Sequence, residues 1–180
     1  MTNPTLSITD VVRQSLAFLS KDSLSKHDLS KHDLSKDKNA ASADQPFTGL
    51  IIGNDTQSVF SQIQAIDQAV SWEAFDYQAF IAHRFAKRYD LAVIILSNDS
   101  AIDTQIIQRC RDLFAKHCLV VQNLSEPATG VDVVSFGFSR LHEQPIVEND
   151  QDHHTSYQVW QFNLFDYKHL PDWFNSKFWA

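Results

Sequence analysis

Glycine is scarce in this sequence of 180 residues. There are four glycines, Gly49, Gly53, Gly130 and Gly137, where average usage of about 7% would give roughly 13. Neither G-x-G-x-x-G nor G-x-x-x-x-G-K-[ST] can be written from these four positions. The sequence therefore excludes the protein classes that bind phosphates through glycine-rich loops.

Basic residues are also few. The chain carries 15 Lys and Arg against 22 Asp and Glu, a formal net charge of −7 with His neutral. Because a net anion is not attracted to nucleic acid or to an anionic membrane surface, we expect neither as a partner. The longest apolar run, residues 91–96, is far below the roughly 20 residues that a membrane-spanning helix needs.

Signals for export, for disulfides and for metal binding are missing too. No basic residue precedes Arg13 and no continuous apolar run follows, so we expect a cytoplasmic protein. Cys110 and Cys118 form no disulfide framework and lack metal-ligand spacing, which predicts that both are buried core residues. The adjacent His153 and His154 would point apart on extended backbone, so we expect no metal site there.

The first 46 residues predict a helix followed by a linker. Apolar residues at positions 8, 11, 12, 16 and 19 share one helical face, which predicts an N-terminal helix within residues 1–20. Ser7 or Thr9 would cap it, with Asp10 in the first turn. A five-residue repeat, L-S-K-H-D, then begins at Leu24. Because a period of five builds no continuous apolar face, residues 21–46 are predicted to be a flexible low-complexity linker before a domain at 47–180.

From residue 47 onward, apolar strands and helices alternate. Strands are predicted at 47–53, 70–75, 89–96 and 118–122, and helices at 59–69, 80–88 and 102–116. The run at 89–96 is apolar on both faces and rich in β-branched residues, as a central parallel strand should be. This alternation predicts a mostly parallel α/β sheet with flanking helices.

The last third of the chain has a different pattern. Strands are predicted at 133–141 and 157–165, separated by a polar segment at 143–156. With no helix between them, these two strands should pair antiparallel at one edge of the sheet. The apolar alternation changes phase between Val159 and Trp160, which predicts either a bulge or burial on both faces.

This order of elements resembles the class I methyltransferase fold, a Rossmann-like architecture that binds S-adenosylmethionine. The segment L-I-I-G-N-D at 50–55 lies where that family has its first strand and cofactor turn. The segments Y-D-L-A-V-I-I at 89–95 and C-L-V-V at 118–121 are similar to its fourth and fifth strands, and F-G-F-S-R-L at 136–141 to its L-G-F strand. The resemblance covers residues 47–165.

The C-terminal residues carry a more specific resemblance. Y-K at 167–168, P-D-W-F-N at 171–175 and F-W-A at 178–180 are similar to the ending Y-K-x-x-P-D-W-L-N-x-x-F-W-A of a small bacterial family of unknown function with such a core. Phe174 replaces the usual Leu. The aromatic tail either packs over the sheet edge or forms a protein-binding patch. Packing is favoured, because an exposed aromatic patch promotes aggregation.

The resemblance implies a cofactor site at the carboxyl ends of the strands. The corresponding cofactor-binding residues are Gly53, Asn54 and Asp55 after the first strand, Glu73 or Asp76 as acceptor for the ribose hydroxyls, and Asn98 and Asp99 after the fourth strand. No catalytic residue and no metal ligand is assigned. The favoured interpretation of the segments at 53–55 and 98–100 is a strand-to-helix turn that carries an N-cap, because fold alone does not establish function.

The turn after the first predicted strand, residues 53–55, determines which function we expect. Gly53 is its single glycine, and Asn54 and Asp55 place a side chain and a negative charge where the cofactor carboxylate would lie. We therefore expect a degenerate methyltransferase-like protein that binds a small molecule, or a protein partner, without robust catalysis. The alternative is an active S-adenosylmethionine-dependent methyltransferase with an atypical cofactor loop.

Overall fold

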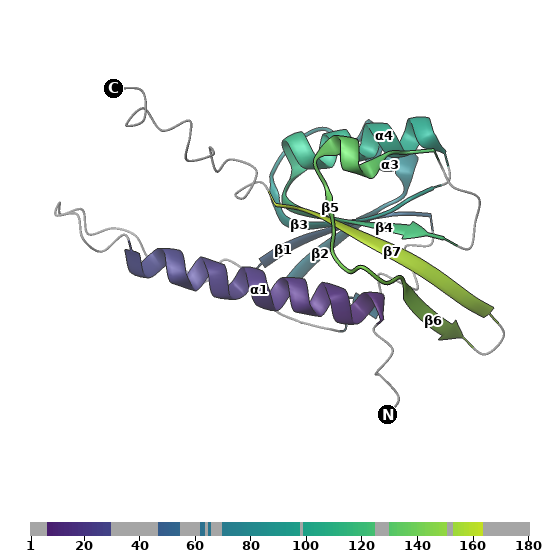
Figure 1. Cartoon of the computed structure of the whole chain (residues 1–180). Helices are drawn as coiled ribbons and strands as arrows, with labels where there is room; N and C mark the ends of the chain where they lie inside the picture. The colour runs from purple at the N-terminus through teal and green to yellow at the C-terminus, as the bar shows by residue number, and fades with distance from the viewer. Residues whose placement is uncertain are drawn as a thin grey trace, which may run out of the picture.

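The strands form one mixed sheet (Figure 1). The computed structural model describes residues 7–29, 47–54, 62–63, 65, 70–97, 99–124, 130–150 and 153–163. The strand order is β2 (Val70–Phe75), β1 (Phe47–Ile52), β3 (Tyr89–Ile95), β4 (Ala115–Asn123), β7 (His153–Asn163) and β5 (Ser139–Arg140), and β6 (Ile146–Asp150) also pairs with β7. The first four are parallel, and β7 is antiparallel to β4, β5 and β6. The predicted α/β Rossmann-like fold with an antiparallel C-terminal pair is confirmed.

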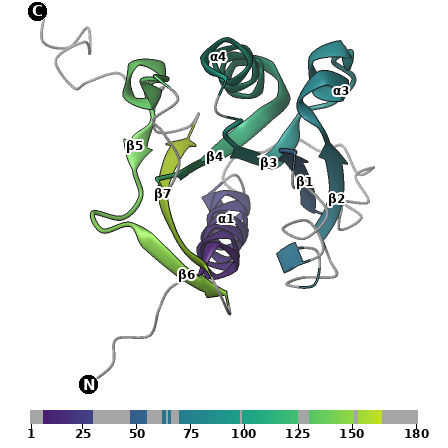
Figure 2. The same ribbon diagram turned by 90° about the vertical axis from the view of Figure 1, so that its right-hand side faces the viewer.

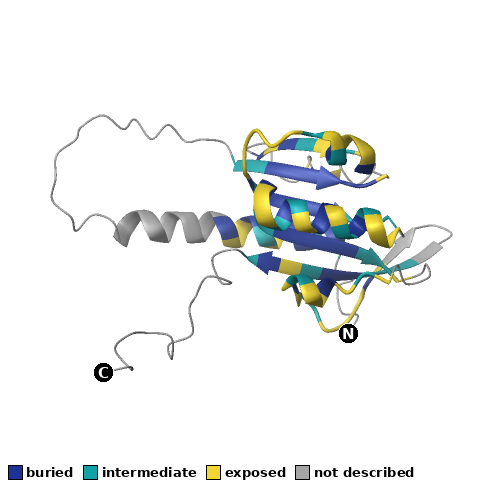
Figure 3. Cartoon of the chain, turned by 90° about the horizontal axis from the view of Figure 1, so that it is seen from above, coloured by how far each residue is buried: buried dark blue, intermediate teal, exposed yellow. Residues whose placement is uncertain are grey.

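Helices cover both faces of the sheet (Figure 2). Helix α1 (Ile8–Leu29) lies on one face, and α3 (Tyr77–Ala82) and α4 (Ser100–Arg109) lie on the other. Strand β3 supplies both layers: Leu91 and Val93 pack with α1, whereas Ala92 and Ile94 pack with α3 and α4. The strands in the middle of the sheet are accordingly buried (dark blue in Figure 3).

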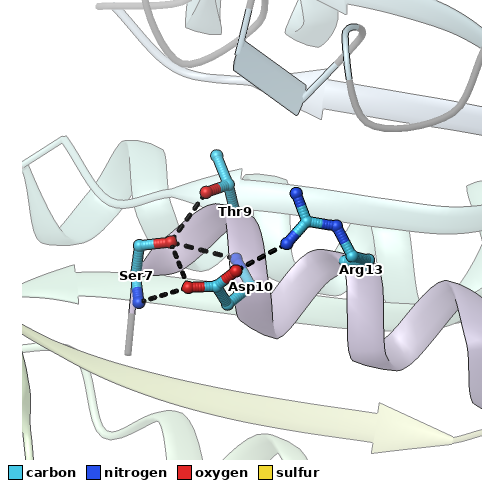
Figure 4. A network of polar contacts seen from close by, with 4 residues as sticks. All are labelled: Ser7, Thr9, Asp10 and Arg13. Carbon is cyan, nitrogen blue, oxygen red and sulfur yellow. Dashed lines mark hydrogen bonds and ion pairs between the residues drawn. The ribbon is translucent and has the colours of Figure 1, made fainter. Parts of the chain in front are cut away.

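The start of α1 is fixed by its own side chains (Figure 4). Ser7 Oγ accepts a hydrogen bond from the Asp10 N–H at 3.1 Å, and Asp10 Oδ2 accepts one from the Ser7 N–H at 3.2 Å. This reciprocal pair is a capping box, so Ser7 and not Thr9 is the N-cap. The hydrogen bonds from Ser7 lower the pKa of Asp10.

Helix α1 is longer than predicted and belongs to the same folded unit as the sheet. The five apolar positions predicted for one face are all buried in the layer that contains the sheet residues Leu91, Val93 and Leu119. The helix continues to Leu29, nine residues beyond the predicted end at residue 20. No Gly or Pro interrupts this stretch, and each added residue gains a backbone hydrogen bond. No helix in the described part of the chain is long and apolar enough to cross a membrane.

The predicted helix at 80–88 is replaced by a shorter one. Helix α3 ends at Ala82, and residues 83–88 have no regular structure. The His83 ring stacks on Phe75 with centroids 4.7 Å apart, and the His83 carbonyl accepts a hydrogen bond from Arg109 Nη2 at 2.6 Å. These contacts between elements override the helical spacing of the local sequence.

The predicted helix at 102–116 also ends early. Helix α4 stops at Arg109 and passes into a π-helical turn, η2 (Cys110–Phe114), so β4 begins at Ala115. Arg88 donates to the carbonyls of Leu113 at 2.9 Å and Asp112 at 2.7 Å. It therefore satisfies acceptors that a helix end leaves unpaired. Cys110 and Cys118 are buried free thiols, as predicted.

The prediction of a strand at 133–141 is mostly wrong. Its first half is a 3₁₀ helix, η3 (Val133–Phe136), and only β5 is extended. The Asp132 side chain accepts from the Val134 N–H at 3.1 Å, and Gly137 ends the turn with a φ of 82°. A capping carboxylate and a left-handed glycine favour a helical turn over a strand.

Strand β7 is an interior strand. It begins at His153, four residues before the predicted start, and the segment predicted as polar loop contains β6. Val159 packs in the layer that contains α1, whereas Trp160 and Phe162 pack in the layer that contains α3 and α4. Burial on both faces, one of the two predicted explanations, accounts for the phase change. The linker predicted at 21–46 is wrong for residues 21–29, which belong to α1, and its residues 30–46 lie outside the described residues. Most of the predicted helix at 59–69 and the tail at 164–180 also lie outside them.

Gly49 is required where Trp72 crosses from the neighbouring strand. The two residues are partners in the β1–β2 register, and a methyl carbon on Gly49 would lie 2.6 Å from Trp72 Cδ2. We predict that Gly49→Ala lowers the free energy of unfolding by about 1–3 kcal/mol through overpacking. In a Trp72→Leu background the same change should cost less. Equal costs in both backgrounds, measured by urea unfolding, would contradict this contact.

The Asp90 side chain links β1, β3 and β4 near their amino ends. Its Oδ2 accepts from the Thr48 N–H and hydroxyl, both at 2.9 Å, and its Oδ1 pairs with Lys116 Nζ at 2.6 Å. Burial alone would raise the pKa of Asp90, but these hydrogen bonds outweigh it, and the pKa lies below its usual range. The stabilisation is therefore present above the unfolded-state pKa, about 4, and is lost as the pH falls through the folded-state value.

We predict that Asp90→Asn reduces this pH dependence. At pH 7 the variant should be less stable than wild type, by about 1–2 kcal/mol. Below pH 4 the difference should shrink, because wild-type Asp90 becomes protonated as well. Urea unfolding of both proteins at pH 7 and pH 3 measures this. A difference that stays constant would show that the carboxylate charge contributes nothing.

Candidate functional site

The chain reverses its direction of winding between β1 and β3. From β1 it proceeds to β2 on one side, and from β3 to β4 on the other, so these two central strands flank a topological switch point. In open α/β sheets, ligands bind beyond the carboxyl ends of the strands at such a point. Here Gly53 follows β1, Asp76 follows β2 and Ser97 lies just beyond β3. We call this region the carboxyl edge.

Gly53 allows the neighbouring strands to pack closely at the carboxyl edge. Its N–H donates to the Phe75 carbonyl at 3.2 Å, and a methyl carbon placed on it would lie 3.1 Å from Ile95 Cβ. The space that glycine leaves is therefore taken by the Ile95 side chain. The Tyr77 hydroxyl donates to the Ile95 carbonyl at 2.8 Å, which fixes the end of β3, and Asn54 is exposed.

Asp76 and Asp99 are exposed carboxylates at the edge, and each caps a helix. Asp76 Oδ1 accepts from the Ala79 N–H at 2.7 Å at the start of α3. Asp99 Oδ1 accepts from the N–H groups of Ala101 at 3.0 Å and Ile102 at 3.2 Å at the start of α4. Both bonds to Asp99 and the one to Asp76 use Oδ1, so among the described residues Oδ2 of each carboxylate contacts no hydrogen-bond donor.

The turn after β3 rests on a residue that the sequence argument missed. Asp103 is fully buried, and its Oδ1 accepts from the Ser97 N–H at 2.8 Å. The carboxylate thus reaches back from the first turn of α4 and holds the loop that carries Asp99. The available signal was the spacing D-S-A-I-D at 99–103, in which a second acid follows a capping acid within one helical turn.

Glu73 lies apart from the carboxyl edge. Its Oε2 accepts from the Tyr89 hydroxyl at 2.7 Å, and its other oxygen pairs with Lys87. The hydrogen bond from Lys87 lowers the pKa of Glu73 despite partial burial, and burial next to Glu73 raises the pKa of Tyr89. Of the predicted site residues, the structure brings Gly53, Asn54, Asp76 and Asp99 to the edge, whereas Asp55 and Asn98 lie outside the described residues.

The two halves of S-adenosylmethionine have different chemical requirements at such an edge. Asp76 offers an exposed carboxylate oxygen, the acceptor that a pair of ribose hydroxyls requires. The methionine half would need open space above glycine backbone, but Ile95 fills the space at Gly53. Among the described residues, the edge thus has an exposed carboxylate after β2 and no open space at the Cβ position of Gly53.

Several solved structures that are similar to this chain at low identity are named as methyltransferases. Precorrin-6y C5,15-methyltransferase from Geobacter metallireducens GS-15 has a TM-score of 0.45 and 13% identity over 66% of this chain and 80% of its own. Magnesium protoporphyrin IX methyltransferase from Synechocystis PCC 6803, with bound S-adenosylmethionine, has a TM-score of 0.44 and 8% identity over 89% and 86%. N-methyltransferase NodS from Bradyrhizobium japonicum WM9 has a TM-score of 0.39 and 13% identity over 65% and 86%.

Sequence comparison identifies a family. A profile described as a family of unknown function (DUF6231) matches residues 15–180, which is most of the chain. A search of the curated proteins gives no match. The identities with the solved structures are so low that their similarity concerns the fold alone.

We predict that Lys87 and Tyr89 keep the pKa of Glu73 low. Lys87→Met should raise the pKa of Glu73 toward its ordinary value, because the strongest hydrogen bond to the ionised carboxylate is lost. Tyr89→Phe should raise it less. NMR titration of the side-chain carboxyl carbon measures both shifts. An unchanged pKa in the Lys87 variant would show that the ion pair does not form in solution.

Proposed function

The chain belongs to the family of unknown function (DUF6231), and we propose, from the geometry of the carboxyl edge, that it binds a nucleoside-like small molecule without efficient methyl transfer. The position of Asp76 carries this proposal. Asp76 follows β2 directly, 23 positions after Gly53. An acid about 20 residues beyond the first turn is where Rossmann-like proteins accept hydrogen bonds from ribose hydroxyls.

The local structure suits Asp76 to this role. The cap bond to Ala79 fixes the carboxylate through Oδ1 and keeps the side chain in one orientation. Oδ2 remains as a charged acceptor, and hydrogen bonds to charged groups are stronger than those between neutral groups. Because the bond to Ala79 exists without ligand, little ordering is required when a ribose binds.

The first turn opposes the methionine half of S-adenosylmethionine. Ile95 fills the space at Gly53, and Asn54 adds a side chain immediately after it. Asp55 follows in the sequence with a negative charge. Two like charges about 4 Å apart at an effective dielectric of ~20 repel by roughly 4 kcal/mol. Adenosine, which has no such carboxylate, avoids this repulsion.

Comparing two ligands by isothermal titration calorimetry tests the proposal. Adenosine should bind the full-length protein, and S-adenosylmethionine should bind no tighter than adenosine. Much tighter binding of S-adenosylmethionine would contradict the proposal and support an active methyltransferase. If neither ligand binds, the proposal is also contradicted, and binding of a protein partner becomes the favoured function.

Matched variants locate the nucleoside. Asp76→Asn should weaken adenosine binding by at least about tenfold, because a charged acceptor becomes a neutral amide. Glu73→Gln makes the same chemical change on β2, and it should leave adenosine affinity unaltered. 2′,3′-Dideoxyadenosine should bind weakly to wild type and should not respond to Asp76→Asn. Equal losses for both nucleosides would show that Asp76 acts only as a helix cap.

Asp55→Gly tests the obstruction of the first turn. Removing the side chain and its charge should improve S-adenosylmethionine binding and leave adenosine binding nearly unchanged. Calorimetric titration of the variant with both ligands measures this. Tight wild-type binding of S-adenosylmethionine that the substitution weakens would instead make Asp55 a contact to the cofactor's amino group.

A further inference from the structure

A cavity of about 340 Å³ lies between α1 and the sheet, away from the carboxyl edge. It is lined near the amino ends of β3 and β4, by Leu91 and His117, and at the end of β7, by Asn163. Its volume is within the range of small-molecule sites. The cavity therefore lies toward the opposite end of the sheet from Gly53, Asp76 and Asp99.

The chemistry of the lining is neutral. None of the lining residues is Asp, Glu, Lys or Arg. The hydrogen-bonding side chains converge from α1, β4, β7 and the segment after β5, and they are Gln14, Ser15, His117, His142, Gln161 and Asn163. Because a charged ligand would lose water without gaining a counter-charge here, this lining selects uncharged ligands.

One residue of the lining, His142, has a ring nitrogen that lacks a hydrogen-bond partner among the described residues. His142 Nε2 is buried, and among the described residues it has no hydrogen-bond partner. The backbone of His142 is held in place, since its carbonyl accepts from Gln158 Nε2 at 2.9 Å and Gln158 is buried. A buried nitrogen without a partner is costly, and a turn of the His142 ring that brings Nε2 to the cavity lets a ligand with a complementary group remove this cost.

The apolar part of the lining favours a flat ring. Leu19 on α1 and Leu91 and Leu119 on the sheet are buried, whereas Phe18, also on α1, is 62% exposed. An aromatic ligand would bury Phe18 and pack against it and the histidine rings. The geometry points to a second binding site, for an uncharged aromatic heterocycle that forms a hydrogen bond with His142.

Benzimidazole is a suitable probe, because it is flat and mostly uncharged at pH 7.5 and has both a donor and an acceptor nitrogen. Titration of the ¹⁵N-labelled full-length protein should give saturable amide shifts at Ser15, Leu119 and Gln161. Benzimidazole-5-carboxylate should bind at least about tenfold more weakly, since its charge finds no partner. The absence of saturable shifts, or equal binding of the carboxylate, would overturn the inference.

Two variants and one control test the location. Ser15→Trp should fill the cavity and abolish binding, whereas Gln108→Trp adds the same side chain at an exposed position of α4 and should not. His142→Phe keeps the ring and should weaken benzimidazole binding by about fivefold, the effect of one hydrogen bond. Thermal unfolding identifies variants that fail to fold. Unchanged affinity in a folded Ser15→Trp or His142→Phe protein would overturn the site.

Discussion

Residues 91–94 of β3 are at most 1% exposed, so this strand needs an apolar layer on each face. Helices α3 and α4 provide one layer and α1 provides the other. With both faces covered, ligands reach the sheet chiefly from its two ends. Both sites inferred for this protein lie at such ends, the carboxyl edge beyond β1 to β3 and the cavity near the amino ends of β3 and β4.

At the carboxyl edge, the side chains proposed to recognise a ligand also stabilise the fold. Asp76 and Asp99 each cap a helix, and buried Asp103 holds the loop between β3 and α4. These bonds fix the carboxylates before any ligand arrives, which limits the entropy lost on binding. The same packing closes the space at Gly53, where Ile95 lies. A single arrangement therefore supports the proposal that a nucleoside is favoured over the methionine half of S-adenosylmethionine.

The spacing of apolar residues in the sequence predicted those helices and strands whose buried residues recur at a regular interval. The α1 face, β2 and the doubly buried β3 were predictable because their apolar residues repeat at helical or strand spacing. The ends of α3 and α4 were not, since Arg109 and Arg88 fix them through carbonyls distant in sequence. At the site, sequence left Glu73 and Asp76 as equal alternatives. The structure separates them, because Glu73 contacts Tyr89 and Lys87 whereas Asp76 lies at the carboxyl edge. The cavity was unpredictable because it requires α1 to pack over β4 and β7.

Mapping adenosine by NMR tests the central claim most directly. In the ¹⁵N-labelled full-length protein, adenosine should shift the backbone amides of Gly53, Asn54, Tyr77 and Asp99 in a saturable manner. The amides of Leu119 and Gln161, which line the cavity beneath α1, should not move. This result would place the nucleoside at the carboxyl edge. Shifts confined to Leu119 and Gln161, or no saturable shift at any amide, would contradict the account.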